Sequence, residues 1–154
     1  MSNVEFVKIS SGWASNEYWA GKLTQQLGHR PQSHAEEEVE AALLDGANQK
    51  FVAQVDGQIV GAIAYQMDDN ANEVTATHLG SMVSGIGTQL MQKAMKYASR
   101  MKVPLRLQSS NEAVGFYAKM GFEDEGQNMF VWYPPSVKSL VHEAVKEILL
   151  SSKL

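Results

Sequence analysis

The sequence predicts an α/β (α+β) fold in which a mixed central sheet is flanked by helices. Short apolar runs typical of strands alternate with longer stretches of helical periodicity, and glycine or proline separates most of them. The chain has 154 residues, of which 44% are hydrophobic and 19% charged. This length and composition favour one globular domain over residues 1–154, with a core at about 4–133 and an appended helix at about 136–150.

The first half of the chain is expected to contain a strand, two helices and three further strands. We place them at residues 4–9 (strand), 15–27 and 35–44 (helices), and 51–55, 59–66 and 73–79 (strands). Ser15 is the expected N-cap of the first helix, and Gly28 its stop. Acidic residues open the second helix, as the helix dipole prefers. Asp56-Gly57 is a strong signal for a two-residue hairpin turn.

The second half is expected to contain three helices and three strands. We place them at residues 88–101 (helix), 105–108 (strand), 111–120 (helix), 122 and 129–133 (strands) and 136–150 (helix). Asn111 is the expected cap of the middle helix and Gly121 its stop. The last helix carries an unbroken apolar stripe, formed by Val137, Leu140, Val141, Ala144, Val145, Ile148 and Leu149.

Composition excludes several classes of protein. The absence of cysteine excludes a disulfide scaffold, a thiol nucleophile and cysteine-ligated metal. The chain starts without a signal-peptide pattern and has no apolar run of about 20 residues, so we expect a cytoplasmic protein with no membrane association. A net charge of −4 disfavours binding of nucleic acid through phosphate contacts.

Charge is unevenly distributed along the chain. Residues 1–73 contain eleven acidic and four basic residues, whereas residues 74–122 contain one acidic and six basic residues. The middle third therefore suits an anionic ligand and the first half a cationic one. Ordinary solvated faces are the alternative explanation.

The segment from Leu79 to Leu90 is rich in small residues and lies between an expected strand and an expected helix. In this context backbone N–H groups can bind a phosphate, and glycine allows a close approach. Ile86 stands where a P-loop needs lysine, and Leu90 where a dinucleotide fingerprint needs glycine or alanine. A simple spacer between strand and helix is the alternative.

The segment from Asn111 to Phe122 is a second candidate site. Several of its side chains can pack on the core, so a core helix that ends at Gly121 explains most of it. Tyr117 stands out because a phenol at a strand–helix junction can donate a proton to a leaving group.

Together these segments resemble the GNAT (GCN5-related N-acetyltransferase) superfamily. Gly85-Ile86-Gly87 matches the second half of its acetyl-CoA loop, Arg/Gln-x-x-Gly-x-Gly/Ala. Asn111 and Tyr117-Ala118-Lys119-Met120-Gly121-Phe122 match its later motif, and residues 51–61 look like its hairpin of strands two and three. The resemblance spans about residues 4–133. Met82 stands at the Arg/Gln position, which implies weaker pyrophosphate binding or binding by backbone N–H groups alone.

The resemblance implies an N-acetyltransferase that transfers acetyl from acetyl-CoA directly to an amine and releases CoA. Tyr117 matches the general acid of the family, and Glu73 and His78 are candidate bases. For His78 a structural strand histidine is the alternative, and for Glu73 a solvated residue. The implied cofactor-binding residues are Leu79, Gly80, Val83, Ser84, Gly85, Ile86, Gly87, Thr88, Asn111, Phe116 and Lys119. The basic residues expected to meet the outer phosphates are Lys93, Lys96, Arg100 and Lys119.

The acceptor is a small-molecule or peptide amine in this interpretation. Trp13, Tyr18 and Trp19 lie in the region that borders the acceptor site of the family, and the acids at residues 36–40 can attract a cation; core packing and a solvated face are the alternatives. His29 and His34 are too isolated for a metal site, so no metal is expected.

Two further functions are compatible with the sequence. The first is an acetyl-CoA-binding regulatory module of the same fold without catalysis. The second is an enzyme of this fold that uses another acyl group or a nucleobase acceptor. The stripe on the last helix predicts packing against the chain's own sheet or a homodimer, of which we favour the dimer.

Overall fold

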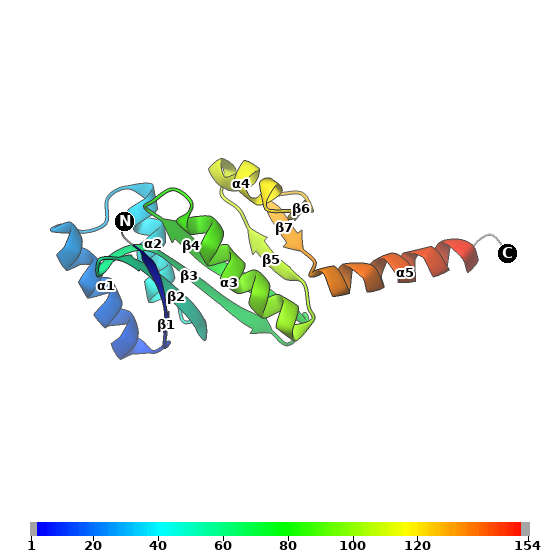
Figure 1. Cartoon of the computed structure of the whole chain (residues 1–154), viewed down its shortest axis with the longest axis horizontal. Helices are drawn as coiled ribbons and strands as arrows, with labels where there is room; N and C mark the ends of the chain where they lie inside the picture. Colours follow the sequence, from blue (N-terminus) through cyan, green and yellow to red (C-terminus); the bar gives the residue numbers. More distant parts are fainter. Residues whose placement is uncertain (1–2, 152–154) are drawn as a thin grey trace. The chain divides into compact units, whose positions relative to one another are not determined.

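The structure is a computed structural model that describes residues 3–151 (Figure 1). The strands are β1 (Val4–Ile9), β2 (Gln49–Val55), β3 (Gln58–Asp68), β4 (Glu73–Ser81), β5 (Leu105–Gln108), β6 (Glu123–Asp124) and β7 (Met129–Trp132). The helices are α1 (Trp13–Leu27), α2 (His34–Leu44), α3 (Ile86–Met101), α4 (Val114–Lys119) and α5 (Pro135–Ser151), with a 3₁₀ turn at Asn111–Ala113. The seven strands follow the order β1-β2-β3-β4-β5-β7-β6, so the predicted mixed sheet with flanking helices is confirmed.

The chain divides into two compact units. Unit 1 comprises Met1–Met67 and Thr75–Ala94, and unit 2 comprises Asp68–Val74 and Met95–Leu154. The boundary therefore passes through β4 and through α3. The single domain expected from the sequence stays a prediction, and each unit is described by itself below.

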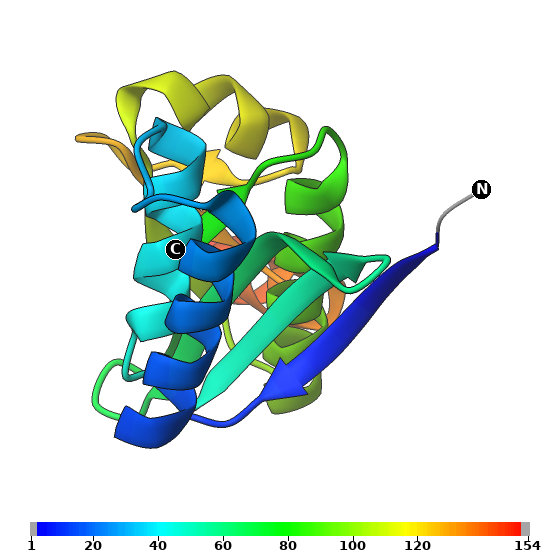
Figure 2. The same cartoon turned by 90° about the vertical axis from the view of Figure 1, so that its left-hand side faces the viewer.

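In unit 1, β1, β2 and β3 form an antiparallel meander. The predicted hairpin turn is confirmed: Asp56 and Gly57 both adopt positive φ, at 51° and 79°, as a two-residue turn between twisted strands requires. Helices α1 and α2 lie side by side on one face of these strands (Figure 2).

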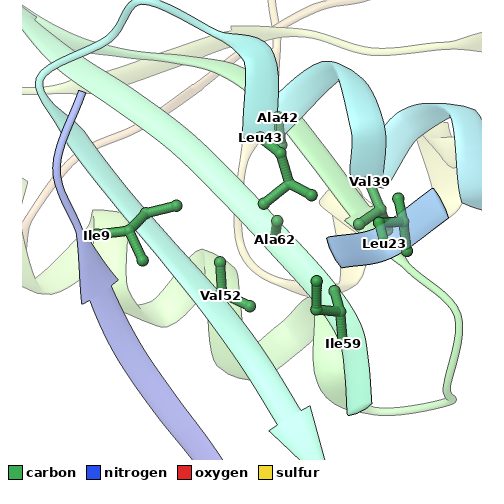
Figure 3. Packing of buried hydrophobic residues seen from close by; sticks show 8 residues of the cluster. All are labelled: Ile9, Leu23, Val39, Ala42, Leu43, Val52, Ile59 and Ala62. Carbon is green, nitrogen blue, oxygen red and sulfur yellow. The ribbon is translucent and has the colours of Figure 1, made fainter. Parts of the chain in front are cut away.

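A hydrophobic cluster fills the space between α1, α2 and this face of the sheet (Figure 3). Its members come from β1, β2 and β3 on one side and from the two helices on the other: Ile9, Val52, Ile59, Ala62, Leu23, Val39, Ala42 and Leu43. Side chains alternate between faces along a strand, so Gly61, next to Ala62, faces the other way. A Cβ atom at Gly61 would lie 2.9 Å from the Ile86 and Leu90 side chains of α3. The start of α3 therefore covers the opposite face of β3.

Helix starts differ from the predictions in three places in unit 1, and α2 begins one residue early, at His34. Gly12 is the N-cap of α1, and the predicted cap Ser15 lies inside the helix, where its hydroxyl donates to the Ser10 carbonyl at 2.8 Å. Helix α3 begins at Ile86, two residues before the predicted start. The predicted stop of α1 is confirmed, since Gly28 adopts the left-handed conformation.

Unit 2 contains the antiparallel strands β5, β7 and β6 and the short helix α4. Gly121 ends this helical segment with a φ of +92°, as predicted. Asn111 was expected as the helix cap but lies in the 3₁₀ turn, and its carboxamide oxygen accepts a hydrogen bond from the Asn128 side chain at 2.6 Å. The side-chain pair replaces the cap because the loop before β7 brings Asn128 to the turn.

The last helix of unit 2, α5, exposes most of its apolar stripe. Leu140 is 71% exposed and Ile148 67%. The side chain of Val141, which the stripe includes, lies outside the described part of the structure. Among the described residues, no helix is long and apolar enough to cross a membrane.

Candidate active site

The loop that joins β4 to α3 in unit 1 is built from a few backbone hydrogen bonds. The Met82 amide donates to the Val60 carbonyl at 2.8 Å, and the Ser81 hydroxyl donates to the Val83 carbonyl at 2.6 Å. The Ile86 amide donates to the same carbonyl at 3.3 Å. Val83, Ser84 and Gly85 are consequently presented to solvent on a turn that is fixed at both ends.

Gly85 has the conformation that glycine is needed for. Its φ is +87°, and a Cβ atom built there would meet no atom within 4 Å. The backbone at this position is therefore open to a ligand. The buried Ile86 side chain packs toward β3, so neither this residue nor Gly87 after it presents a side chain to a ligand.

The loop leads into the N-terminus of a helix of 16 residues. The first N–H groups of a helix lack acceptors within the helix, and the dipole adds partial positive charge there. The first turn of α3 holds no acidic residue, and Thr88 is exposed on it. An anion such as the pyrophosphate of acetyl-CoA fits these residues.

The two residues before the loop have different surroundings. A Cβ atom at Gly80 would lie 2.3 Å from the Val39 amide nitrogen, so glycine is required there for the close approach of β4 to α2. Leu79 is partly buried. Met82, at the position where the GNAT pattern has Arg or Gln, packs against the hydrophobic cluster and adds no polar group to the loop.

In unit 2 the residues of the second motif gather around Tyr117. This side chain is only 8% exposed and stacks on Phe116 with ring centroids 5.0 Å apart. The Phe122 ring meets it edge-on at 5.6 Å. Lys119, in the last turn of α4, is exposed. The phenol is thus held by a rigid aromatic cluster.

Glu73, one of the two predicted bases, is paired with a cation. The Arg106 Nε atom donates to both oxygens of its carboxylate, at 2.9 and 3.1 Å, and the same guanidinium binds Glu125. These hydrogen bonds, that of Glu73 above all, raise the pKa of Arg106. Both Glu73 oxygens are therefore engaged by the Arg106 guanidinium.

His78, the other predicted base, lies near the end of β4 in unit 1. Its Nδ1 atom is 2.6 Å from the Asp45 Oδ2 atom, at the C-terminal end of α2. The His78 side chain is 43% exposed and that of Asp45 14%. The sequence did not indicate this pair, because no periodicity relates residues in a helix cap and a distant strand.

Lys50 is a second residue that the sequence did not single out. It is only 1% exposed, and its Nζ atom donates to the Asn16 carboxamide oxygen and to the Leu43 and Asp45 carbonyls, at 2.6, 2.7 and 3.0 Å. Its burial lowers the pKa of the ammonium. The buried cation holds together the last carbonyls of α2, which has no basic residue in its own last turn.

The basic residues of α3 are partly engaged elsewhere. The Lys93 ammonium lies 5.1 Å from the Phe6 ring centroid and 5.3 Å from that of Phe51, so it packs over β1 and β2. Arg100 lies over the Tyr97 ring at 5.7 Å. Contact of these cations with the outer phosphates of CoA stays a prediction. Over residues 3–151, no cluster of three or more His, Asp or Glu side chains is arranged to hold a metal ion.

The order of the elements and the glycine-containing loop between β4 and α3 are those expected for the GNAT fold, and comparison with known proteins agrees. The sequence matches the family described as "Acetyltransferase (GNAT) domain" over residues 22–131, more than half of the chain, and the protein therefore belongs to the GNAT family. A search of curated protein sequences finds no match.

Solved structures of this family share the fold. The catalytic domain of the Tetrahymena GCN5 histone acetyltransferase in complex with coenzyme A superposes with a TM-score of 0.59, at 16% identity, covering 84% of this chain and 92% of that one. Arabidopsis thaliana Naa50 in complex with the bisubstrate analogue CoA-Ac-MVNAL gives 0.51 at 22% identity, covering 83% and 95%. A GNAT family acetyltransferase from Streptococcus pneumoniae gives 0.52 at 23% identity, covering 79% and 88%.

Proposed function

We propose that this protein is an N-acetyltransferase that transfers acetyl from acetyl-CoA to an amine of a small molecule or a peptide. The observation that carries the proposal is the exposed turn at Gly85, which leads into a helix start without acidic residues, in a chain of the GNAT family. The coenzyme A and bisubstrate complexes of the structural neighbours support this choice of cofactor.

The cofactor contacts follow from the family motif. When bound, acetyl-CoA supplies an acetyl group activated as a thioester. The backbone of Leu79 and Gly80 pairs with the pantetheine arm in this proposal, and the pyrophosphate is bound by the loop and first helical turn, residues Val83, Ser84, Gly85, Ile86, Gly87 and Thr88. Asn111, Phe116 and Lys119 contribute from the second motif.

Transfer is direct in this proposal. The chain has no cysteine, so no thiol is available to carry the acetyl group. A base removes a proton from the acceptor ammonium, because only the neutral amine is nucleophilic. Tyr117 then protonates the departing thiolate; its rigid aromatic surroundings support a fixed position for the phenol.

A second function is favoured by one observation. Met82 is turned into the hydrophobic cluster, so the loop lacks the polar side chain of the GNAT pattern. The alternative is therefore an acetyl-CoA-binding regulatory module without catalysis. Such a module would bind the cofactor and release no thiol with any amine.

Two further features belong to the proposal. The exposed apolar residues of α5 support a homodimer formed through this helix. A sedimentation mass of two chains is expected, and a mass of one chain would exclude the dimer. The cytoplasmic location expected from the sequence also stays a prediction.

The decisive experiment combines cofactor binding with turnover. Acetyl-CoA at millimolar concentration should raise the melting temperature through ligand linkage, and Gly85→Trp should abolish the rise by filling the open turn. A panel of small-molecule and peptide amines should then reveal at least one acceptor that releases free thiol. Binding without thiol release would favour the regulatory module, and no binding would reject both functions.

A further inference from the structure

The contact between His78 and Asp45 fixes which imidazole nitrogen carries the proton. Partial burial of Asp45 opposes its ionisation, but hydrogen bonds with His78, Thr77 and the Ala47 amide outweigh it and lower the pKa of the carboxyl below its ordinary 3.8. A carboxylate only accepts hydrogen bonds, so Nδ1 of His78 is the donor in this contact. In the tautomer that this contact selects, Nε2 carries the lone pair, and the His78 side chain is 43% exposed.

Asp45 itself is held in place from two sides. Its Oδ1 atom accepts a hydrogen bond from the Ala47 amide at 2.7 Å, which leaves Oδ2 directed at His78. Its backbone carbonyl is bound by the buried Lys50 ammonium, and Asn16 donates to the neighbouring Leu44 carbonyl at 3.1 Å. The orientation of the imidazole is therefore tied to a partly buried network in unit 1.

Resting on the proposed function, we infer that His78 is the general base for the acceptor amine and that Asp45 is the positioning residue that sets its tautomer. A histidine with a bound carboxylate at Nδ1 presents a basic Nε2 and receives charge stabilisation when that atom takes a proton. Glu73 is the weaker candidate because both of its oxygens are bound by Arg106. The acceptor class that needs such a base is an alkyl amine, which is an ammonium ion at neutral pH.

The step balances in atoms and charge. Nε2 of His78 takes one proton from the ammonium, and Asp45 stabilises the resulting imidazolium. The nitrogen lone pair forms the new C–N bond as the C–S bond breaks. Tyr117 protonates the departing thiolate, and the second proton leaving nitrogen restores the Tyr117 phenol. The imidazolium returns its proton to water. One ammonium ion and one thioester thus give one amide, one thiol and one proton.

Asp45→Asn tests the positioning role directly. The new carboxamide oxygen can still accept from the Ala47 amide, while its N–H group donates to Nδ1 and moves the imidazole proton to Nε2. We expect kcat to fall by roughly 10²- to 10⁴-fold for the variant, as for loss of a general base, with the acceptor KM changed by a few-fold only. His78→Gln should lose as much, and both variants should keep the thermal shift with acetyl-CoA.

A control variant, the tautomer of His78 and a conservative replacement of Asp45 test the two roles further. His34→Gln is the matched control, because His34 is an exposed histidine that pairs with Glu38 along α2 at 3.6 Å; its kcat should equal that of the wild type. Nitrogen-15 NMR of neutral His78 should show the Nδ1–H tautomer in the wild type and the Nε2–H tautomer in Asp45→Asn. Asp45→Glu should restore part of the lost kcat.

The outcomes separate this inference from the proposed function. If the wild type acetylates an amine and His78→Gln stays within three-fold of it, the base assignment is wrong and the function stands. If only Asp45→Asn stays within three-fold, the positioning role of Asp45 is wrong. An Nε2–H tautomer in the wild type would overturn the role of Asp45 even if a variant fails to fold. A wild type that acetylates no amine would overturn the proposed function and the base role with it.

Discussion

The Nδ1 atom of His78 lies 2.6 Å from the Oδ2 atom of Asp45, and 33 positions separate the two residues in the chain. The contact joins the end of β4 to the end of α2. The position of Asp45 is supported by Lys50, whose buried ammonium donates to the Leu43 and Asp45 carbonyls at this end of the helix. Asp45 thus connects the buried Lys50 ammonium, through its carbonyl, with the exposed His78 imidazole, through its carboxylate.

Replacement of Lys50 tests the role of this buried cation. Lys50→Met removes the ammonium donor from the Asn16 carboxamide oxygen and from the Leu43 and Asp45 carbonyls, of which, among the described residues, only that of Asp45 keeps another donor, the Asn16 side chain. The free energy of unfolding should fall by roughly 1–3 kcal/mol, the cost of buried polar groups that lose their partner. Urea unfolding measures this loss. Lys8→Met, on the exposed face of β1, is the matched control and should change stability by less than about 0.5 kcal/mol.

Acid should weaken the interaction of Asp45. The pKa of its carboxyl is lowered in the folded state, so its contribution to stability is present above pH ~4 and is lost as the pH falls through the folded-state value. The difference in unfolding free energy between the wild type and Asp45→Asn should therefore shrink below pH ~4. Asp69→Asn, in the exposed turn before β4, serves as control. A difference that stays constant from pH 6 to pH 3 would contradict the prediction.

The two glycines at either end of the β4–α3 loop should respond differently to alanine. At Gly80 the added Cβ would meet the backbone of α2 at 2.3 Å, so we expect a loss of about 3 kcal/mol through overpacking. At Gly85 space is open and only the positive φ is unfavourable, which costs about 1 kcal/mol. Thermal or urea unfolding compares them. Equal losses would show that the close approach of α2 and β4 is wrong.

Removal of the Tyr117 hydroxyl should affect turnover and leave packing intact. Tyr117→Phe keeps the ring that stacks on Phe116, so the fold and the thermal shift with acetyl-CoA should persist. The kcat should fall about 10²-fold if the phenol protonates the leaving thiolate. Tyr133→Phe is the control. Unchanged turnover in Tyr117→Phe would remove it from the acid role.

Most elements of the fold could be predicted because their signals are local. The Asp56-Gly57 turn, the stop at Gly28 and the run of acids opening α2 each depend on neighbouring residues. The cap of α1 could not be assigned in this way. Gly12 and Ser15 are both compatible with a helix start, and the hydrogen bond of Ser15 to Ser10 is a property of the folded turn.

The site was predictable only in part. The loop around Gly85 and the helix of Tyr117 follow contiguous motifs, so the sequence indicates them. Asp45 and Lys50 carry no such signal, because their contacts connect α2 with β4 and β2. Sequence alone indicated Glu73 and His78 as candidate bases, with a solvated residue favoured for Glu73, and it could not identify their partners, Arg106 and Asp45.

The most direct test of the account is the stoichiometry of the reaction of the wild-type protein. Acetyl-CoA is mixed with each amine of the panel, free thiol is titrated, and the acceptor is weighed by mass spectrometry. The account predicts one acetylated amine for each thiol released, with no acetyl group left on the protein. Absence of acetylated product with every amine, or acetyl transfer that stops on the protein itself, would contradict it.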